Sequence, residues 1–135
     1  MNTAIQVIAG ALACVVYVLA ARRAGPGREP KVYAVGLVLA ALVYVGFAAA
    51  GGAARRWWVL ESVGLVLFSA AALLVTRRNV WALALGWAAH AAWDFLLHGP
   101  ADAAFVPGWY PAVCAGFDLA LALYLGVRGT PGVRD

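Results

Sequence analysis

Residues 32–50 read VYAVGLVLAALVYVGFAAA and contain no Lys, Arg, Asp or Glu. This length is close to the ~20 residues with which a helix crosses the ~30 Å hydrocarbon core of a bilayer. Inside hydrocarbon, every backbone N–H and C=O group has to be satisfied within the segment, and these apolar residues show no alternation of period two. The stretch therefore predicts a transmembrane helix.

Four further runs of similar length share this composition and lie at residues 3–21, 57–76, 80–97 and 109–127. The chain is 65% hydrophobic and 12% charged, which leaves too few charged residues to cover a soluble domain of this size. We therefore predict an all-α integral membrane bundle of five transmembrane helices, forming a single transmembrane domain over residues 1–135 in contact with the lipid bilayer. Because no positive residue precedes the first run and Arg22 and Arg23 follow it, we expect a retained helix rather than a cleaved signal peptide.

The ten Lys and Arg residues lie in short groups between the apolar runs and form no basic face, which argues against binding of nucleic acid. Such groups are topology signals, because cytoplasmic loops carry an excess of positive residues. Only Arg55 and Arg56 fall on the opposite side. We predict a protein of the cell (plasma) membrane with its N-terminus outside and its C-terminus in the cytoplasm. The basic residues on the predicted cytoplasmic side are Arg22, Arg23, Arg28, Lys31, Arg77, Arg78, Arg128 and Arg134.

Five ionisable side chains interrupt the last three apolar runs. A charge in hydrocarbon costs at least ~2.5 kcal/mol, so such residues tend to face the interior of a bundle. His90, Asp94 and His98 recur every four residues and therefore line one face of a helix with 3.6 residues per turn. The five residues are Glu61, His90, Asp94, His98 and Asp118.

Counting ~1.5 Å per residue from the outer end of each helix places these groups in one half of the membrane. Glu61, Asp94 and Cys114 then share a level about 6 Å deep, while His90 and Asp118 share a level about 12 Å deep. Short connections favour packing of these three helices as neighbours, which predicts a polar site in the outer leaflet. The candidate catalytic residues are His90, Asp94, Asp118 and Glu61, with Tyr44 as a candidate hydroxyl at a similar depth.

Three chemistries suit such a site. Imidazole and carboxylate groups together bind Zn²⁺ or Fe²⁺, and the candidate metal ligands are His90, Asp94, Asp118 and His98. His90 and His98 lie about 12 Å apart along the helix axis, which weighs against both binding one ion. A His–carboxylate pair in a low dielectric also does acid–base work on a hydrophobic small molecule. The third alternative is a relay within a subunit of a proton- or ion-coupled transporter.

Each of these residues also has a purely structural interpretation. An intramembrane His or Asp often serves only to hydrogen-bond a neighbouring helix. Glu61 follows Arg55 and Arg56, which are ionic partners close by at the interface. His98 stands near Pro100 at a helix end, where it can cap backbone carbonyls. A structural membrane protein is therefore an alternative to an enzyme, and the chain can form a homo-oligomer in either case.

The stretch WAAHAAWDFLLH at residues 87–98, followed by VPGWYP at residues 106–111 and then by Cys114 and Asp118, resembles small bacterial integral membrane proteins of the uncharacterised DUF6010 type. The resemblance covers the C-terminal third of the chain. In that family a second His often follows the block that corresponds to residues 87–98, whereas this sequence has Gly99 at that position. The resemblance supports the choice of residues and implies no particular reaction.

Overall fold

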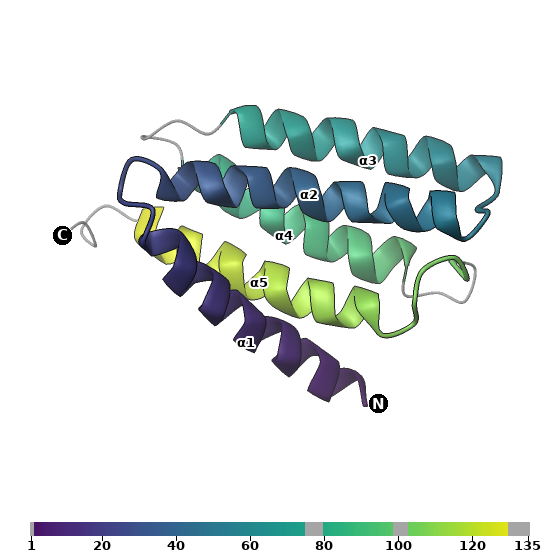
Figure 1. Cartoon of the computed structure of the whole chain (residues 1–135), viewed down its shortest axis with the longest axis horizontal. Helices are drawn as coiled ribbons and strands as arrows, with labels where there is room; N and C mark the ends of the chain where they lie inside the picture. The colour runs from purple at the N-terminus through teal and green to yellow at the C-terminus, as the bar shows by residue number, and fades with distance from the viewer. Residues whose placement is uncertain (1, 75–79, 99–102, 130–135) are drawn as a thin grey trace.

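The computed structural model describes residues 2–74, 80–98 and 103–129, and within these ranges the secondary structure is helical, without strands (Figure 1). Each of the five helices is long and apolar enough to cross a membrane. The predicted all-α bundle is therefore confirmed. The helices are α1 (Thr3–Arg22), α2 (Glu29–Ala50), α3 (Arg55–Leu73), α4 (Val80–Leu97) and α5 (Tyr110–Gly129).

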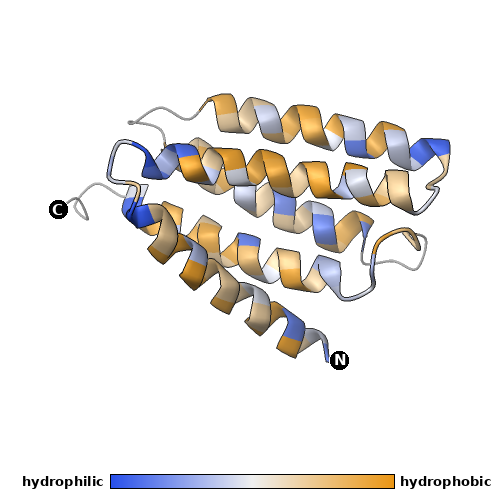
Figure 2. Ribbon diagram, in the orientation of Figure 1, coloured by the Kyte–Doolittle hydropathy of each residue, from blue (hydrophilic) through white to orange (hydrophobic). Residues whose placement is uncertain are grey.

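The surface of the bundle is apolar and its interior holds polar groups. Leu12, Val66, Leu96 and Leu123 are 63–73% exposed, and Figure 2 shows hydrophobic residues along most of each helix, with hydrophilic ones near the ends and in short bands within α3, α4 and α5. A soluble protein of this size has the opposite distribution. Lipid is the solvent that suits such a surface, and the five candidate spans indicate a multi-pass membrane protein.

The helix bounds differ from the predicted runs because hydropathy locates the apolar stretch and not the helix ends. Helix α2 begins at Glu29, ahead of the predicted run 32–50, with Pro30 in its first turn. A proline is tolerated there because its missing N–H would have had no partner inside the helix, and an acidic residue is favourable at this end. Helix α3 begins at Arg55 and ends at Leu73, so it starts and ends earlier in the chain than the predicted run 57–76.

The two ends of the bundle are distinguished by their connections. The α1–α2 connection and the last turn of α5 lie at one end, and the α2–α3 connection and the first turn of α5 lie at the other (Figure 1). We refer to these as the predicted cytoplasmic end and the predicted outer end. Arg77, Arg78 and Arg134, which contribute to the predicted orientation, lie outside the described residues. The orientation stays a prediction.

Helix α5 packs between α1 and α4, while α2 packs against α3 (Figure 1). The backbones of α1 and α5 touch at two glycines. A Cβ atom on Gly10 would lie 1.9 Å from the carbonyl oxygen of Val113, and one on Gly116 would lie 2.1 Å from that of Val7. A side chain of any size would push the helices apart, so these glycines set how closely α1 approaches α5.

An apolar layer fills the half of the bundle nearer the predicted cytoplasmic end. Leu37, Leu83 and Leu121, from three different helices, have no exposed surface. Beyond them, at the end of the bundle, Glu29 forms an ion pair with Arg128. The leucine layer therefore separates this terminal ion pair from the polar groups near the middle of α4 and α5.

Candidate functional site

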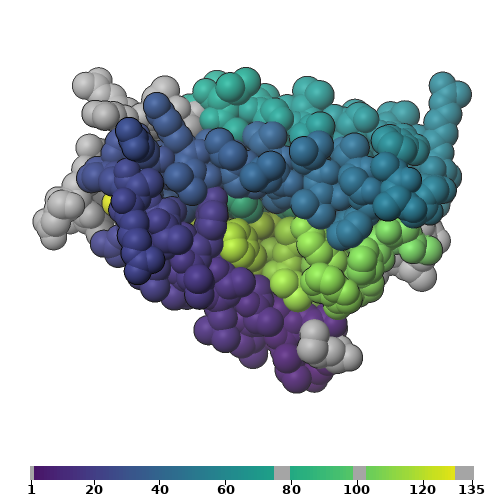
Figure 3. All heavy atoms as spheres, viewed as in Figure 1, coloured from purple at the N-terminus to yellow at the C-terminus, as the bar shows by residue number. Residues whose placement is uncertain are grey.

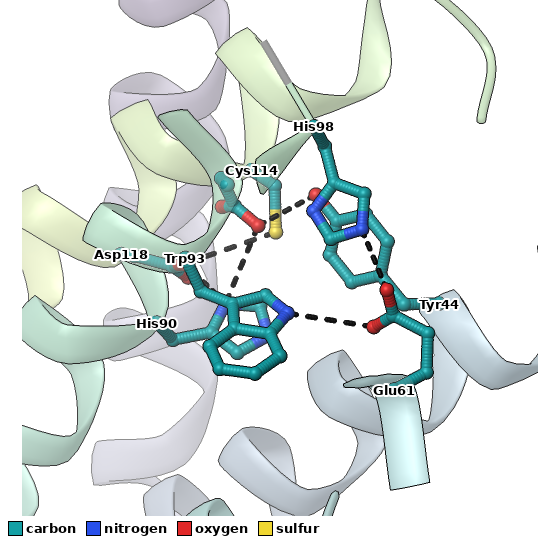
Figure 4. A network of polar contacts seen from close by, with 8 residues as sticks. Tyr44, Glu61, His90, Trp93, His98, Cys114 and Asp118 are labelled. Carbon is teal, nitrogen blue, oxygen red and sulfur yellow. Dashed lines mark hydrogen bonds and ion pairs between the residues drawn. The ribbon is translucent and has the colours of Figure 1, made fainter. Parts of the chain in front are cut away.

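Four buried side chains from α4 and α5 converge near the middle of the bundle (Figure 4). His90 and Asp94 come from α4, and Cys114 and Asp118 come from α5. Each offers one atom of a kind that binds metals, and these atoms all lie within 4.8 Å of one another. His90, Asp94 and Asp118 have no exposed surface, and Cys114 is 8% exposed. We refer to these four residues as the His–Asp–Cys cluster.

The local sequence explains why the four side chains meet. Each helix supplies two residues four positions apart, so each pair lies on one helix face a turn apart. Ala91 and Ala115, next to these pairs, are 1% and 0% exposed. Small residues at a helix contact let the backbones come close, which brings the short Asp and Cys side chains within reach across the α4–α5 contact.

Direct contacts tie the cluster together. The Nδ1 atom of His90 lies 2.7 Å from Oδ2 of Asp118 and 3.7 Å from Oδ1 of Asp94. The thiol of Cys114 donates to the same Asp118 oxygen at 3.8 Å. From α2, the hydroxyl of Tyr44 donates to Oδ1 of Asp94 at 2.5 Å. Three helices therefore hold the cluster, and Tyr44 orients one of its carboxylates.

Several polar atoms of the cluster have no hydrogen-bond partner within the described residues. They are Nε2 of His90, Oδ2 of Asp94 and Oδ1 of Asp118, and each is buried. Buried polar atoms are normally paired, because an unpaired one carries the full cost of its lost hydration. These three atoms leave the cluster with unused binding capacity toward a further group.

The charges of the cluster point to the kind of group that fits. Two carboxylates face one imidazole in a region without solvent, where an uncompensated charge is costly. A divalent cation balances two carboxylates while the imidazole stays neutral, and the site keeps one negative charge if Cys114 binds the ion as a thiolate. The donor set of one nitrogen, carboxylate oxygens and one sulfur contains the ligand types that Zn²⁺ takes in proteins. His90, Asp94, Cys114 and Asp118 are thus the residues able to hold a metal.

Glu61 and His98 form a second polar pair, toward the predicted outer end. The Nε2 atom of His98 lies 2.8 Å from Oε1 of Glu61, and both residues are buried. The indole N–H of Trp93 donates to the other carboxylate oxygen at 3.4 Å. The ring of Tyr44 stacks on His98 with centroids 4.0 Å apart, so Tyr44 touches both polar groups (Figure 4).

The structure brings together His90, Asp94 and Asp118 of the predicted metal ligands. His98, the fourth predicted ligand, lies with Glu61 outside the cluster, because two helix turns separate it from His90. Cys114 holds the fourth position instead. Glu61, predicted as a catalytic residue, is likewise held by His98 and Trp93 rather than by the cluster. The sequence contained one signal that Cys114 belongs to the cluster, which is its four-residue spacing from Asp118.

A cavity of about 540 Å³ opens beside the cluster, between α2 and α5. Figure 3 shows this face of the molecule hollowed between the two helices. The lining is mainly apolar, with Leu39 and Val113 among its residues, and Cys114 and Asp118 also belong to its wall. Two members of the His–Asp–Cys cluster therefore face a space that a small molecule can occupy.

Fold and site together define a five-helix protein of the multi-pass membrane class with a buried His/Asp/Cys cluster. No family model, curated protein or solved structure matches the chain. The resemblance to the DUF6010 type, drawn from the block at residues 87–98 and the residues after it, stays a prediction.

Proposed function

We propose that this protein is a metal-dependent membrane enzyme that acts on a hydrophobic small molecule. One observation carries the proposal: Cys114 and Asp118 belong both to the buried cluster and to the wall of the apolar cavity. An ion bound by His90, Asp94 and these two residues would stand at the edge of that cavity. There it would act as a Lewis acid on an oxygen of the bound molecule.

Zinc suits the cluster better than iron. Non-haem iron(II) enzymes commonly use two histidines and one carboxylate, whereas this cluster contains one histidine, two carboxylates and a thiol. Zinc accepts nitrogen, oxygen and sulfur ligands in tetrahedral geometry. Because the four cluster residues would fill these positions, an oxygen of the bound molecule would bind as a fifth ligand, which zinc can accept during catalysis. The hydrogen bond from Tyr44 to Asp94 is the kind of outer contact that orients a metal-binding carboxylate.

Acid–base catalysis without a metal is the second candidate. The 2.7 Å contact between His90 and Asp118 favours it, because Asp118 belongs to the wall of the cavity and could exchange a proton with a molecule bound there. A transporter relay has less support. Within the described residues, Leu37, Leu83 and Leu121 lie between the cluster and the predicted cytoplasmic end.

The test is the zinc content of detergent-purified protein, with the two cysteines as a matched pair. We expect about one zinc ion per chain in the parent, a content unchanged in Cys14→Ala, and about a tenfold loss in Cys114→Ala after dialysis against a chelator. Cys14 is a suitable control because it is also buried but packs in the apolar core. A metal-free parent would reject the metal-dependent function and leave acid–base catalysis. Equal zinc in both variants would reject Cys114 as a ligand.

A further inference from the structure

The cavity between α2 and α5 has the size of a ligand site. Its volume of about 540 Å³ lies within the ~300–1,000 Å³ typical of pockets that hold small molecules. Val35, Gly36 and Leu39 line it from α2, and Val113 and Phe117 line it from α5. This lining is apolar over most of its extent, so the cavity favours a hydrophobic occupant.

Side chains close both ends of the gap between α2 and α5. At the predicted cytoplasmic end, Glu29 of α2 accepts hydrogen bonds from Tyr124 and Arg128 of α5. At the predicted outer end, Tyr44 of α2 packs against Tyr110 of α5 with ring centroids 5.5 Å apart. Between these closures the two helices do not pack directly against each other. The gap is therefore a window in the side of the bundle.

The window faces the lipid. Val35 and Leu39, on its α2 side, are 58% and 54% exposed. Apolar residues that are this exposed on a membrane-spanning helix contact hydrocarbon, so a molecule dissolved in the bilayer reaches the cavity without crossing water. Access from either aqueous side would have to pass the closures formed by Glu29 and Tyr44.

The polar groups of the cavity indicate what the molecule carries. No Lys or Arg is among the described residues that line it, which disfavours an anionic headgroup. The hydroxyl of Tyr17 already donates to the carbonyl of Val32 at 2.8 Å. Trp87 lines the cavity, is 1% exposed, and its indole N–H has no partner among the described residues. A buried indole N–H usually has an acceptor, so the indole of Trp87 is a donor available for an oxygen on the ligand, together with the hydroxyl of Tyr110, which also lines the cavity.

We infer that the cavity binds an uncharged lipophilic molecule that carries an alcohol, ketone or ester oxygen. The molecule enters sideways from the membrane, with Val35 and Leu39 of α2 on one side of its path and helix α5 on the other. Its oxygen accepts a hydrogen bond from Trp87. Any reaction of the bound molecule rests on the proposed function, because the cluster residues Cys114 and Asp118 share this wall. Binding itself requires only the window and the indole.

Photo-cross-linking in vesicles tests the window. The protein is reconstituted into phosphatidylcholine vesicles with a long-chain alcohol that carries a diazirine, and the labelled peptides are identified by mass spectrometry. We expect label on residues 32–40 of α2 and 110–118 of α5. Leu39→Trp should reduce this labelling about fivefold or more by blocking the window. Leu42→Trp is the matched control, because Leu42 is also lipid-exposed on α2, at 46%, but does not line the cavity.

The indole is tested by comparing two probes. Trp87→Phe replaces the indole with a smaller aromatic ring that has no N–H. It should weaken labelling by the alcohol about fivefold, the size of one hydrogen bond, and leave labelling by the corresponding alkane diazirine unchanged. A repacked cavity would instead alter both probes. Equal effects on alcohol and alkane would therefore overturn the role of Trp87.

The outcomes separate this inference from the proposed function. Label spread evenly over lipid-facing residues, including Val66 of α3, and unchanged by Leu39→Trp would overturn the binding site even if the parent binds zinc. Labelling of the window that persists in Cys114→Ala, or in a parent found to be metal-free, would support the binding site whatever the fate of the metal-dependent function.

Discussion

The variant His90→Gln is expected to lower the affinity for zinc by more than about 100-fold. Loss of an outer contact at a zinc site costs about 10–100-fold, and loss of a direct ligand costs more. His90 has one nitrogen 2.7 Å from Asp118 and a second nitrogen that is buried without a partner in the described part of the chain. The measurement is competition with a fluorescent zinc chelator in detergent.

The chain provides a matched control on the same helix. His98 is also buried, but its contacts are to Glu61 and Tyr44 and not to the cluster. A glutamine there can still hydrogen-bond Glu61, so His98→Gln is expected to change zinc affinity by less than about threefold. If both variants lost zinc equally, or His98→Gln lost more, the ion would not be bound by the cluster in the way described.

The second large effect concerns stability. His98→Leu is expected to destabilise the protein by about 3–5 kcal/mol, because it leaves the carboxylate of Glu61 buried without its hydrogen-bonding partner. Within the described residues, that carboxylate also accepts a hydrogen bond from Trp93, but at 3.4 Å this bond is too long to compensate. Unfolding in mixed detergent micelles, followed by circular dichroism, measures the loss.

The double variant Glu61→Leu/His98→Leu separates a charge effect from a packing effect. Replacing both partners of a buried pair by apolar residues is often neutral, so the double variant should recover most of the stability. Leu96→Ala, a change at a 73% exposed position on the same helix, should stay within about 0.5 kcal/mol of the parent. Losses that simply add in the double variant would mean that Glu61 and His98 do not stabilise each other.

The fold was predictable because length and hydropathy decide it. A run such as 32–50 has no stable alternative to a helix in lipid, and four-residue spacing shows which polar residues share a face. Positions near helix ends were less predictable, as Glu29 and Pro30 illustrate, since a helix continues past its apolar run into the interface. Pro30 marks a turn as readily as a first helical residue in sequence alone.

The composition of the site was only partly predictable. Depth along the helix grouped His90 with Asp118 correctly, since it needs only the rise per residue. Which side chains turn toward each other depends on the rotation of each helix, and this arises from packing between α4 and α5. For that reason Glu61, which the depth count placed level with Asp94 and Cys114, pairs with His98 instead, while Cys114 joins the cluster.

The cavity could not have been predicted. It arises because α2 packs on α3 while α5 packs between α1 and α4, which leaves a gap where α2 and α5 face each other. Residues such as Val35 and Leu39 have the same composition as any lipid-facing helix surface. Only the arrangement of the helices distinguishes a window from an ordinary apolar face.

X-ray absorption at the zinc edge of the zinc-loaded protein shows most directly whether one metal ion is bound by His90, Asp94, Cys114 and Asp118. We expect one sulfur at about 2.3 Å together with nitrogen and oxygen ligands at about 2.0–2.2 Å, and loss of the sulfur signal in Cys114→Ser but not in Cys14→Ser. A zinc ion surrounded by nitrogen and oxygen alone in the parent protein would contradict it.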